Sequence, residues 1–287
     1  KFVEQAELRG TLTKKTIADN PMLSDEVKKQ LIEESGGLTS DYVRREYFCE
    51  LIRDPTASVL PEFTEELSKE ITKEWPLPPF YDNYVSMDLG GKDLTVVLFA
   101  FYDFRADKIV IQDEIEMDFS LSGNNIEKLT KAIDTKEQQL WTNSLSGEIK
   151  RPSVRVSDID YIVTQEISKY SQRHINFIPT KKDNKDAAIN NLRIFLLHKK
   201  IIISPKCKAL LRHLKNVRWL NMDRKIYARS PDNGHYDAVD ACVYLVRSMN
   251  FTKNPYPSHY NLNLRSQDAF YENGRPKSGH PNEIKQI

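Results

Sequence analysis

The sequence predicts an α/β fold built on a mixed β-sheet. Three leading strands are expected at residues 84–89, 94–101 and 108–117, where apolar side chains form short runs or alternate with polar ones. Further along the chain, short apolar runs alternate with segments whose apolar residues recur at helical spacing. Leading strands followed by alternating strands and helices are typical of a mixed sheet flanked by helices.

The segment before the sheet is expected to form helical pieces joined by turns. One helix should begin after Ser24 and another after Ser40, because a serine side chain can cap the first turn of a helix. The second helix is expected to run to about Leu51. Residues 75–79 read Trp-Pro-Leu-Pro-Pro, and prolines this close together continue neither a helix nor a sheet. We therefore expect a domain boundary near residue 80.

The main domain is expected over residues 81–251, after a linker segment over residues 1–80. Its later strands are short apolar runs at residues 153–157, 175–178 and 201–203. Its helices are expected at residues 124–133, 161–170, 186–197, 205–214 and 235–249. Residues 252–287 are rich in Asn, Pro, Ser and Gly, so we expect them to form an extended or mobile tail.

The composition of the 287-residue chain suits one large or two small soluble domains. Hydrophobic residues make up 39% of the chain, enough for a core, and no run approaches the roughly 18 apolar residues of a membrane span. Cys49, Cys207 and Cys242 lie far apart and offer no disulfide framework, so a reducing compartment is expected. Because the sequence begins at Lys1 rather than Met, we expect a piece of a longer protein or a processed chain.

Charge is segregated along the chain although its totals balance. The 42 Lys and Arg residues and 41 Asp and Glu residues give a formal net charge of +1. Residues 1–80 contain 16 acidic and 11 basic residues, whereas residues 181–229 contain 14 basic and 3 acidic ones. Such a basic block suits a polyanion such as nucleic acid, or it is a solvated helical face that the acidic N-terminal part neutralises.

The candidate catalytic groups are carboxylates at the ends of secondary-structure elements. The sequence has neither a Gly-x-Ser-x-Gly motif nor a phosphate-binding loop ending in Gly-Lys-Ser/Thr. Asp88 interrupts an apolar strand, where a lone carboxylate is costly unless it is paired or bound to a metal. Asp158 follows a later strand, and Asp237 and Asp240 lie one turn apart on the last helix. Asp158 and Asp237 could instead only cap or complement a helix, but as a set these acids suit Mg²⁺ or Mn²⁺.

The order of these motifs resembles that of ribonuclease H-like nucleases. More specifically, Asp88 before a glycine turn, Asp158 after a middle strand and residues 235–241 (His-Tyr-Asp-Ala-Val-Asp-Ala) on a late helix are similar to the nuclease domain of the tailed-phage large terminase. Further matching stretches lie at residues 19–21, 39–47, 61–63 and 177–192. The resemblance covers roughly residues 15–250 and implies a sheet of three leading antiparallel strands followed by parallel strands.

The resemblance also implies a set of functional residues. It places three metal ligands on Asp88, Asp158 and Asp237, with Asp160 as an alternative to Asp158 because it is two residues along and on the same side of an extended strand. The resemblance also implies three accessory residues. Asp93 is an acid just after the glycine turn, and His235 could contact the scissile phosphate or a water. Asp240 is an acid one helical turn after the third ligand.

The function implied by the resemblance is cleavage of concatemeric double-stranded DNA by the genome-packaging motor of a virus, in the host cytoplasm and away from any membrane. Two Mg²⁺ or Mn²⁺ ions would activate a water and stabilise the leaving oxygen. Lys182, Lys185 and Arg193 are the candidate phosphate contacts, which carry no information about base sequence. The implied partners are the portal protein, the small terminase subunit and an N-terminal ATPase domain whose motifs this sequence lacks.

Two other interpretations fit the same residues. The chain could be another ribonuclease H-like enzyme, either a Holliday-junction resolvase or a transposase, because resolvases share a pair of acids one helical turn apart. It could also be a non-catalytic assembly module that docks on DNA through the basic block while its acids are structural.

Overall fold

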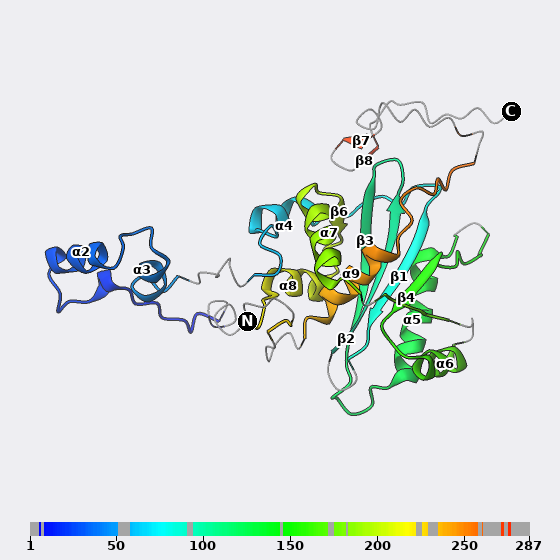
Figure 1. Ribbon diagram of the computed structural model, residues 1–287, viewed down its shortest axis with the longest axis horizontal. Coiled ribbons are helices and arrows are strands. Elements are labelled where there is room, and N and C mark those ends of the chain that lie inside the picture. The colour runs from blue at the N-terminus through cyan, green and yellow to red at the C-terminus, as the bar shows by residue number, and fades with distance from the viewer. Residues whose placement is uncertain are drawn as a thin grey trace. The chain divides into compact units, whose positions relative to one another are not determined.

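The computed structural model describes most of the chain in two compact units. The described residues are 6, 9–50, 58–90, 94–143, 146–171, 175–181, 183–221, 226–228, 235–257, 260, 271–272 and 275–276. The first unit is Lys1–Ser58 and the second is Val59–Ile287 (Figure 1). We describe each unit by itself.

The first unit contains a 3₁₀ turn, η1 (Ile17–Asp19), and two short helices, α2 (Asp25–Glu34) and α3 (Asp41–Glu46). The Ser24 side chain caps α2 by accepting a hydrogen bond from the backbone N–H of Val27 at 3.3 Å, as the sequence predicts. Helix α3 ends five residues before the expected Leu51. Cys49 adopts a left-handed backbone conformation (φ 51°), which cannot continue a right-handed helix.

The second unit is built on a six-stranded mixed sheet with the order β5-β4-β1-β2-β3-β6. Its strands are β1 (Asp82–Asp88), β2 (Leu94–Asp103), β3 (Lys108–Asp118), β4 (Val154–Ser157), β5 (Ile178–Pro179) and β6 (Ile201–Ile203). Strands β1, β2 and β3 pair antiparallel, whereas β4, β5 and β6 each pair parallel to a neighbour. The predicted mixed sheet is therefore confirmed, although β5 is shorter than expected.

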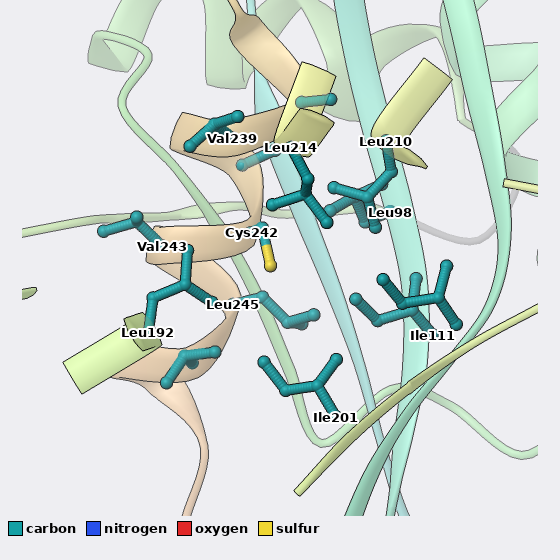
Figure 2. Packing of buried hydrophobic residues seen from close by; sticks show 14 of the residues in the cluster. Leu98, Ile111, Leu192, Ile201, Leu210, Leu214, Val239, Cys242, Val243 and Leu245 are labelled. Atoms are coloured by element: carbon teal, nitrogen blue, oxygen red, sulfur yellow. The ribbon is translucent and has the colours of Figure 1, made fainter. Parts of the chain in front are cut away.

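Helices cover both faces of this sheet (Figure 1). They are α4 (Glu65–Ile71), α5 (Ile126–Trp141), α6 (Tyr161–Tyr170), α7 (Lys185–Leu197), α8 (Lys208–Asn216) and α9 (Asp237–Ser248). Alternate side chains of β2 point to opposite faces, so that Leu98 packs with α7, α8 and α9 while Phe99 packs with α5 and α6. Figure 2 shows Cys242 of α9 inside the first of these clusters, where it is fully buried, as its helical spacing predicts.

The second unit begins earlier than the proline run suggests. Val59, Leu60, Phe63 and Ile71 are buried in the same cluster as α7, α8 and α9. The segment 74–78 forms neither helix nor strand, as expected, but the chain before it already belongs to the sheet domain. The expected boundary near residue 80 thus differs from the structure, because the prolines interrupt secondary structure without interrupting the hydrophobic core.

The start of the tail packs on the sheet domain rather than extending away from it. Tyr256 is buried, and its ring lies 5.4 Å from that of Phe80. The guanidinium of Arg105 lies 4.5 Å from the centre of the Tyr256 ring, within the range of a cation–π contact. Further along, the described part of the tail contains two paired strands, β7 (Tyr271–Glu272) and β8 (Arg275–Pro276).

A half-buried carboxylate from β3 caps helix α8. Cys207, which precedes the helix, makes no side-chain cap, and Glu114 instead accepts hydrogen bonds from the backbone N–H groups of Ala209 at 2.6 Å and Leu210 at 2.9 Å. Burial raises the pKa of Glu114 to about 6 despite these two bonds. In the folded chain this side chain therefore holds its proton to higher pH than in the unfolded chain.

The raised pKa predicts a pH dependence of stability. Between pH 4.5 and 6 the folded state binds more protons at Glu114 than the unfolded state, so the contribution of this residue to the free energy of unfolding falls as pH rises, by at most about 2 kcal/mol. In Glu114→Gln that component should be absent. Urea unfolding of both proteins at pH 4.5 and pH 7 measures it, and parallel pH profiles would contradict the assignment.

Candidate functional site

Four aspartates gather at the carboxyl end of two neighbouring strands. Asp88 is the last residue of β1, and Asp158 follows β4, whose Ser157 pairs in parallel register with Met87. Because parallel strands end at the same edge of the sheet, their terminal acids become neighbours. Asp237 and Asp240 lie in the first turn of α9, which packs against β1, β2 and β4.

The charges of these acids act on one another. Burial raises the pKa of Asp88 well above its usual range, and the charges of Asp240, Asp158 and Asp237 raise it further. Asp88 is 9% exposed and Asp237 is 5% exposed. The structure thus brings Asp88, Asp158, Asp237 and Asp240 together as one cluster of carboxylates.

Asp240 differs from Asp88 in its partners. The ammonium of Lys185 lies 3.1 Å from Asp240 Oδ1 and 3.3 Å from Oδ2, and the Tyr227 hydroxyl donates a hydrogen bond to Oδ1 at 3.3 Å. Burial raises the pKa of Asp240, and the Lys185 charge acts in the opposite direction. Asp240 is therefore an ionic partner of Lys185 at the edge of the cluster.

The structure distinguishes Asp158 from Asp160. Asp160 is exposed and caps α6, because its Oδ1 accepts a hydrogen bond from the Val163 backbone N–H at 3.0 Å. Asp158 instead lies near Asp88, and its charge raises the pKa of Asp88. The geometry thus separates a helix cap from a member of the acid cluster.

The other predicted site residues have different surroundings. His235 is exposed two residues before Asp237. Arg193 makes a forked ion pair with Glu62, with Nε 2.9 Å from each carboxylate oxygen, so its guanidinium already has a partner within the domain. Asp93 and Lys182 lie outside the described residues.

The local fold around Asp237 is fixed by two residues that sequence reasoning missed. Tyr236 adopts a left-handed backbone conformation (φ 65°), which is costly for a bulky residue and must be held by its surroundings. Its ring packs edge-on against His213, whose Nδ1 accepts a hydrogen bond from the Ala238 backbone N–H at 3.3 Å. Burial lowers the pKa of His213 to about 3, so that the ring stays neutral and can accept this bond. No motif in the sequence marks His213 for this role.

A cavity of about 200 Å³ opens beside the acid cluster. It is lined by Asp158, Lys181, Lys185, Ala188, Asp240, Val243, Tyr244 and Arg247. Lys181, Tyr244 and Arg247 were not among the predicted residues. Helical spacing could have found the last two, since Asp237, Asp240, Tyr244 and Arg247 recur every three or four residues along α9.

The type of donor in the cluster fits a hard divalent cation. Carboxylate oxygens are the ligands that Mg²⁺ and Mn²⁺ prefer, and a cation would relieve the repulsion that raises the pKa of Asp88. Within the described ranges, no three His, Cys, Asp or Glu side chains are already arranged so as to hold a metal ion. The donor type of the cluster therefore matches that of a magnesium or manganese site.

Comparison with solved structures finds the same fold in the large terminase of a bacteriophage. The large terminase of a thermophilic bacteriophage matches 82% of this chain at 19% identity with a TM-score of 0.53 in one crystal form, and at 18% identity with a TM-score of 0.52 in another. The chain shares its fold with the large terminase. It spans about half of that protein, 55% and 53% of its length in the two crystal forms.

Sequence comparison adds nothing to this likeness. No family model matches the chain, and no curated protein matches it. A large-terminase nuclease from thermophilic phage G20c is similar over 68% of this chain and 100% of its own, at 17% identity and a TM-score of 0.46. The predicted mixed sheet is confirmed, and its fold is shared with the large terminase. Among the described residues, no helix is long and apolar enough to cross a membrane.

The repulsion within the cluster predicts that replacing two buried aspartates of β1 with asparagine changes the free energy of unfolding in opposite directions. Asp88→Asn should raise the free energy of unfolding of the metal-free chain by about 1–3 kcal/mol, because the amide removes a buried charge that neighbouring carboxylates oppose. Asp82→Asn is the matched control and should be destabilising, since Asp82 pairs with Lys253 at 3.0 Å and accepts a hydrogen bond from Ser153 at 2.9 Å. Urea unfolding in EDTA at pH 8 measures both, and a destabilised Asp88→Asn would contradict the mutual repulsion.

Proposed function

We propose that this chain is a metal-dependent endonuclease of a viral genome-packaging motor and cuts concatemeric double-stranded DNA. One observation carries the proposal, namely that Asp88, Asp158, Asp237 and Asp240 gather at one edge of the sheet. The fold shared with a large terminase supports the same function. No single acid would carry it, because a lone aspartate at a helix start commonly serves as a cap, as Asp160 does.

In this proposal Asp88, Asp158 and Asp237 hold the metal. Asp88 is the most rigidly placed of the three, since it ends a strand that is buried along its whole length and paired on both sides. Mg²⁺ or Mn²⁺ bound by these acids, two ions in the proposed mechanism, would supply an activated water and a Lewis acid for phosphodiester hydrolysis. Asp240, held by Lys185 and Tyr227, is an accessory residue.

The remaining residues of the site are assigned to the substrate in this proposal. His235, exposed two residues before Asp237, would contact the scissile phosphate or a water. Asp93 stays a predicted accessory acid. Lys182, Lys185 and Arg193 stay predicted DNA contacts, and the cavity adds Lys181 and Arg247 to them. Cationic side chains are needed here, because the acids alone would repel a polyanion.

The motor context extends the proposal beyond this chain. A chain that spans about half of a phage large terminase fits a nuclease that works with an ATPase region, a portal protein and a small terminase subunit in the host cytoplasm. The cluster geometry bears on the cutting reaction alone.

Two neighbouring aspartates offer a matched test of the catalytic assignment. Asp158→Asn and Asp88→Asn should abolish Mn²⁺-dependent nicking of supercoiled plasmid, because each removes a ligand charge from the cluster. Asp160→Asn should cut normally, since asparagine caps a helix as well as aspartate does. Circular dichroism checks that each variant is folded. Normal cutting by Asp88→Asn would refute the proposal. Loss of cutting only in Asp160→Asn would show that Asp160, and not Asp158, is the metal ligand.

The DNA contacts predict a change in salt dependence. Replacing Lys181 and Lys182 together with alanine should reduce the slope of log affinity against log salt concentration by about 1.8 for duplex DNA, because each phosphate contact releases counterions. Lys131→Ala on α5, a helix that packs on the opposite face of the sheet from α9, is the control and should leave the slope unchanged. Fluorescence anisotropy with EDTA present measures the slope, and an unchanged slope in the double variant would exclude these contacts.

A further inference from the structure

Lys185 contacts the acid cluster directly, which a side chain that served only to bind DNA phosphates would not need to do. Its ammonium lies within 3.3 Å of both oxygens of Asp240 and 4.0 Å from the centre of the Tyr227 ring, whose hydroxyl donates to the same carboxylate. Asp240 Oδ1 thus receives two protein groups and Oδ2 receives one. The Asp240 side chain is only 16% exposed, so that solvent screens this pair less than a surface ion pair.

The local structure around Lys185 does not itself favour a cation. Lys185 is the first residue of the 13-residue helix α7, where the helix dipole opposes positive charge. The preceding Asn184 is in a left-handed conformation (φ 50°) and makes no side-chain cap. The ammonium is therefore held by Asp240 and Tyr227, which come from segments distant in the sequence.

The negative charges of the acid cluster are therefore neutralised unevenly, more at Asp240 than at Asp88. At one end, Asp240 faces a cation that belongs to the chain. At the other end, Asp88 lies near the carboxylates of Asp158 and Asp237, whose charges oppose its own. A divalent cation arriving at Asp240 would meet an ammonium already 3.1 Å from its oxygen, whereas one arriving at Asp88 would meet the carboxylates of Asp158 and Asp237, which attract it.

We propose that Lys185 is a built-in counter-ion that occupies the Asp240 end of the cluster and weakens the binding of a divalent cation there. The first ion then binds at Asp88, Asp158 and Asp237, and a second ion binds near Asp240 only weakly. The inference rests on the proposed metal-dependent function and deepens it, because it assigns Lys185 to setting the affinity and number of ions.

Calorimetric titration of the whole chain with Mn²⁺ tests this without an activity assay. Lys185→Gln keeps a hydrogen-bond donor for Asp240 but removes the charge, so it should bind Mn²⁺ at least about tenfold more tightly than the wild type or take up one more ion per chain. Lys185→Arg keeps the charge and should behave as the wild type. A thermal-shift series with Mn²⁺ gives a second readout, in which Lys185→Gln should gain more stability than the wild type even if it is less stable without metal.

The outcomes separate the two proposals. Mn²⁺ binding that depends on Asp88 but is the same within threefold in wild type and Lys185→Gln would overturn the counter-ion role and leave the nuclease proposal standing. Binding by Lys185→Gln alone would support the counter-ion role. No binding by either protein, or binding unchanged in Asp88→Asn, would overturn both.

Discussion

Mutual repulsion among four carboxylates is the constraint on which the candidate site depends. Two of them, Asp88 and Asp237, are almost fully buried, and the charges of its neighbours raise the pKa of Asp88. Such an arrangement lowers the stability of the folded chain unless something compensates it. The structure offers one compensation, the ammonium of Lys185 beside Asp240. A divalent cation would be a second.

The rest of the domain supplies the rigidity that keeps these charges together. Strand β1 is buried along its whole length, and apolar clusters cover both faces of the sheet. Helix α9 is placed by the strained backbone of Tyr236 and by the buried ring of His213, which binds the first turn of the helix. Strain and buried like charges at one edge of the sheet are typical of a site selected for function rather than for stability.

Sequence reasoning could predict the fold and the candidate members of the cluster, because strands and acids at element ends follow from local patterns and the family resemblance implied which acids belong together. Strand periodicity, the order of strands and helices, and the acids at element ends were all visible in the sequence. The choice between Asp158 and Asp160 was not, since it depends on where the chain leaves β4 and starts α6. The partner of Lys185 lies 55 residues away, and Arg193 pairs with Glu62 from 131 residues away. Contacts of this range are set by packing and leave no local pattern.

The early start of the sheet domain has a practical consequence for anyone dissecting the chain. The proline run at residues 75–79 invites a cut there, but Val59, Leu60, Phe63 and Ile71 would leave with the discarded segment. Their removal would strip apolar side chains from beneath α7 and α8 and expose a face that the intact chain keeps dry. A fragment designed from the prolines would therefore be prone to aggregate, and its poor behaviour would say nothing about catalysis.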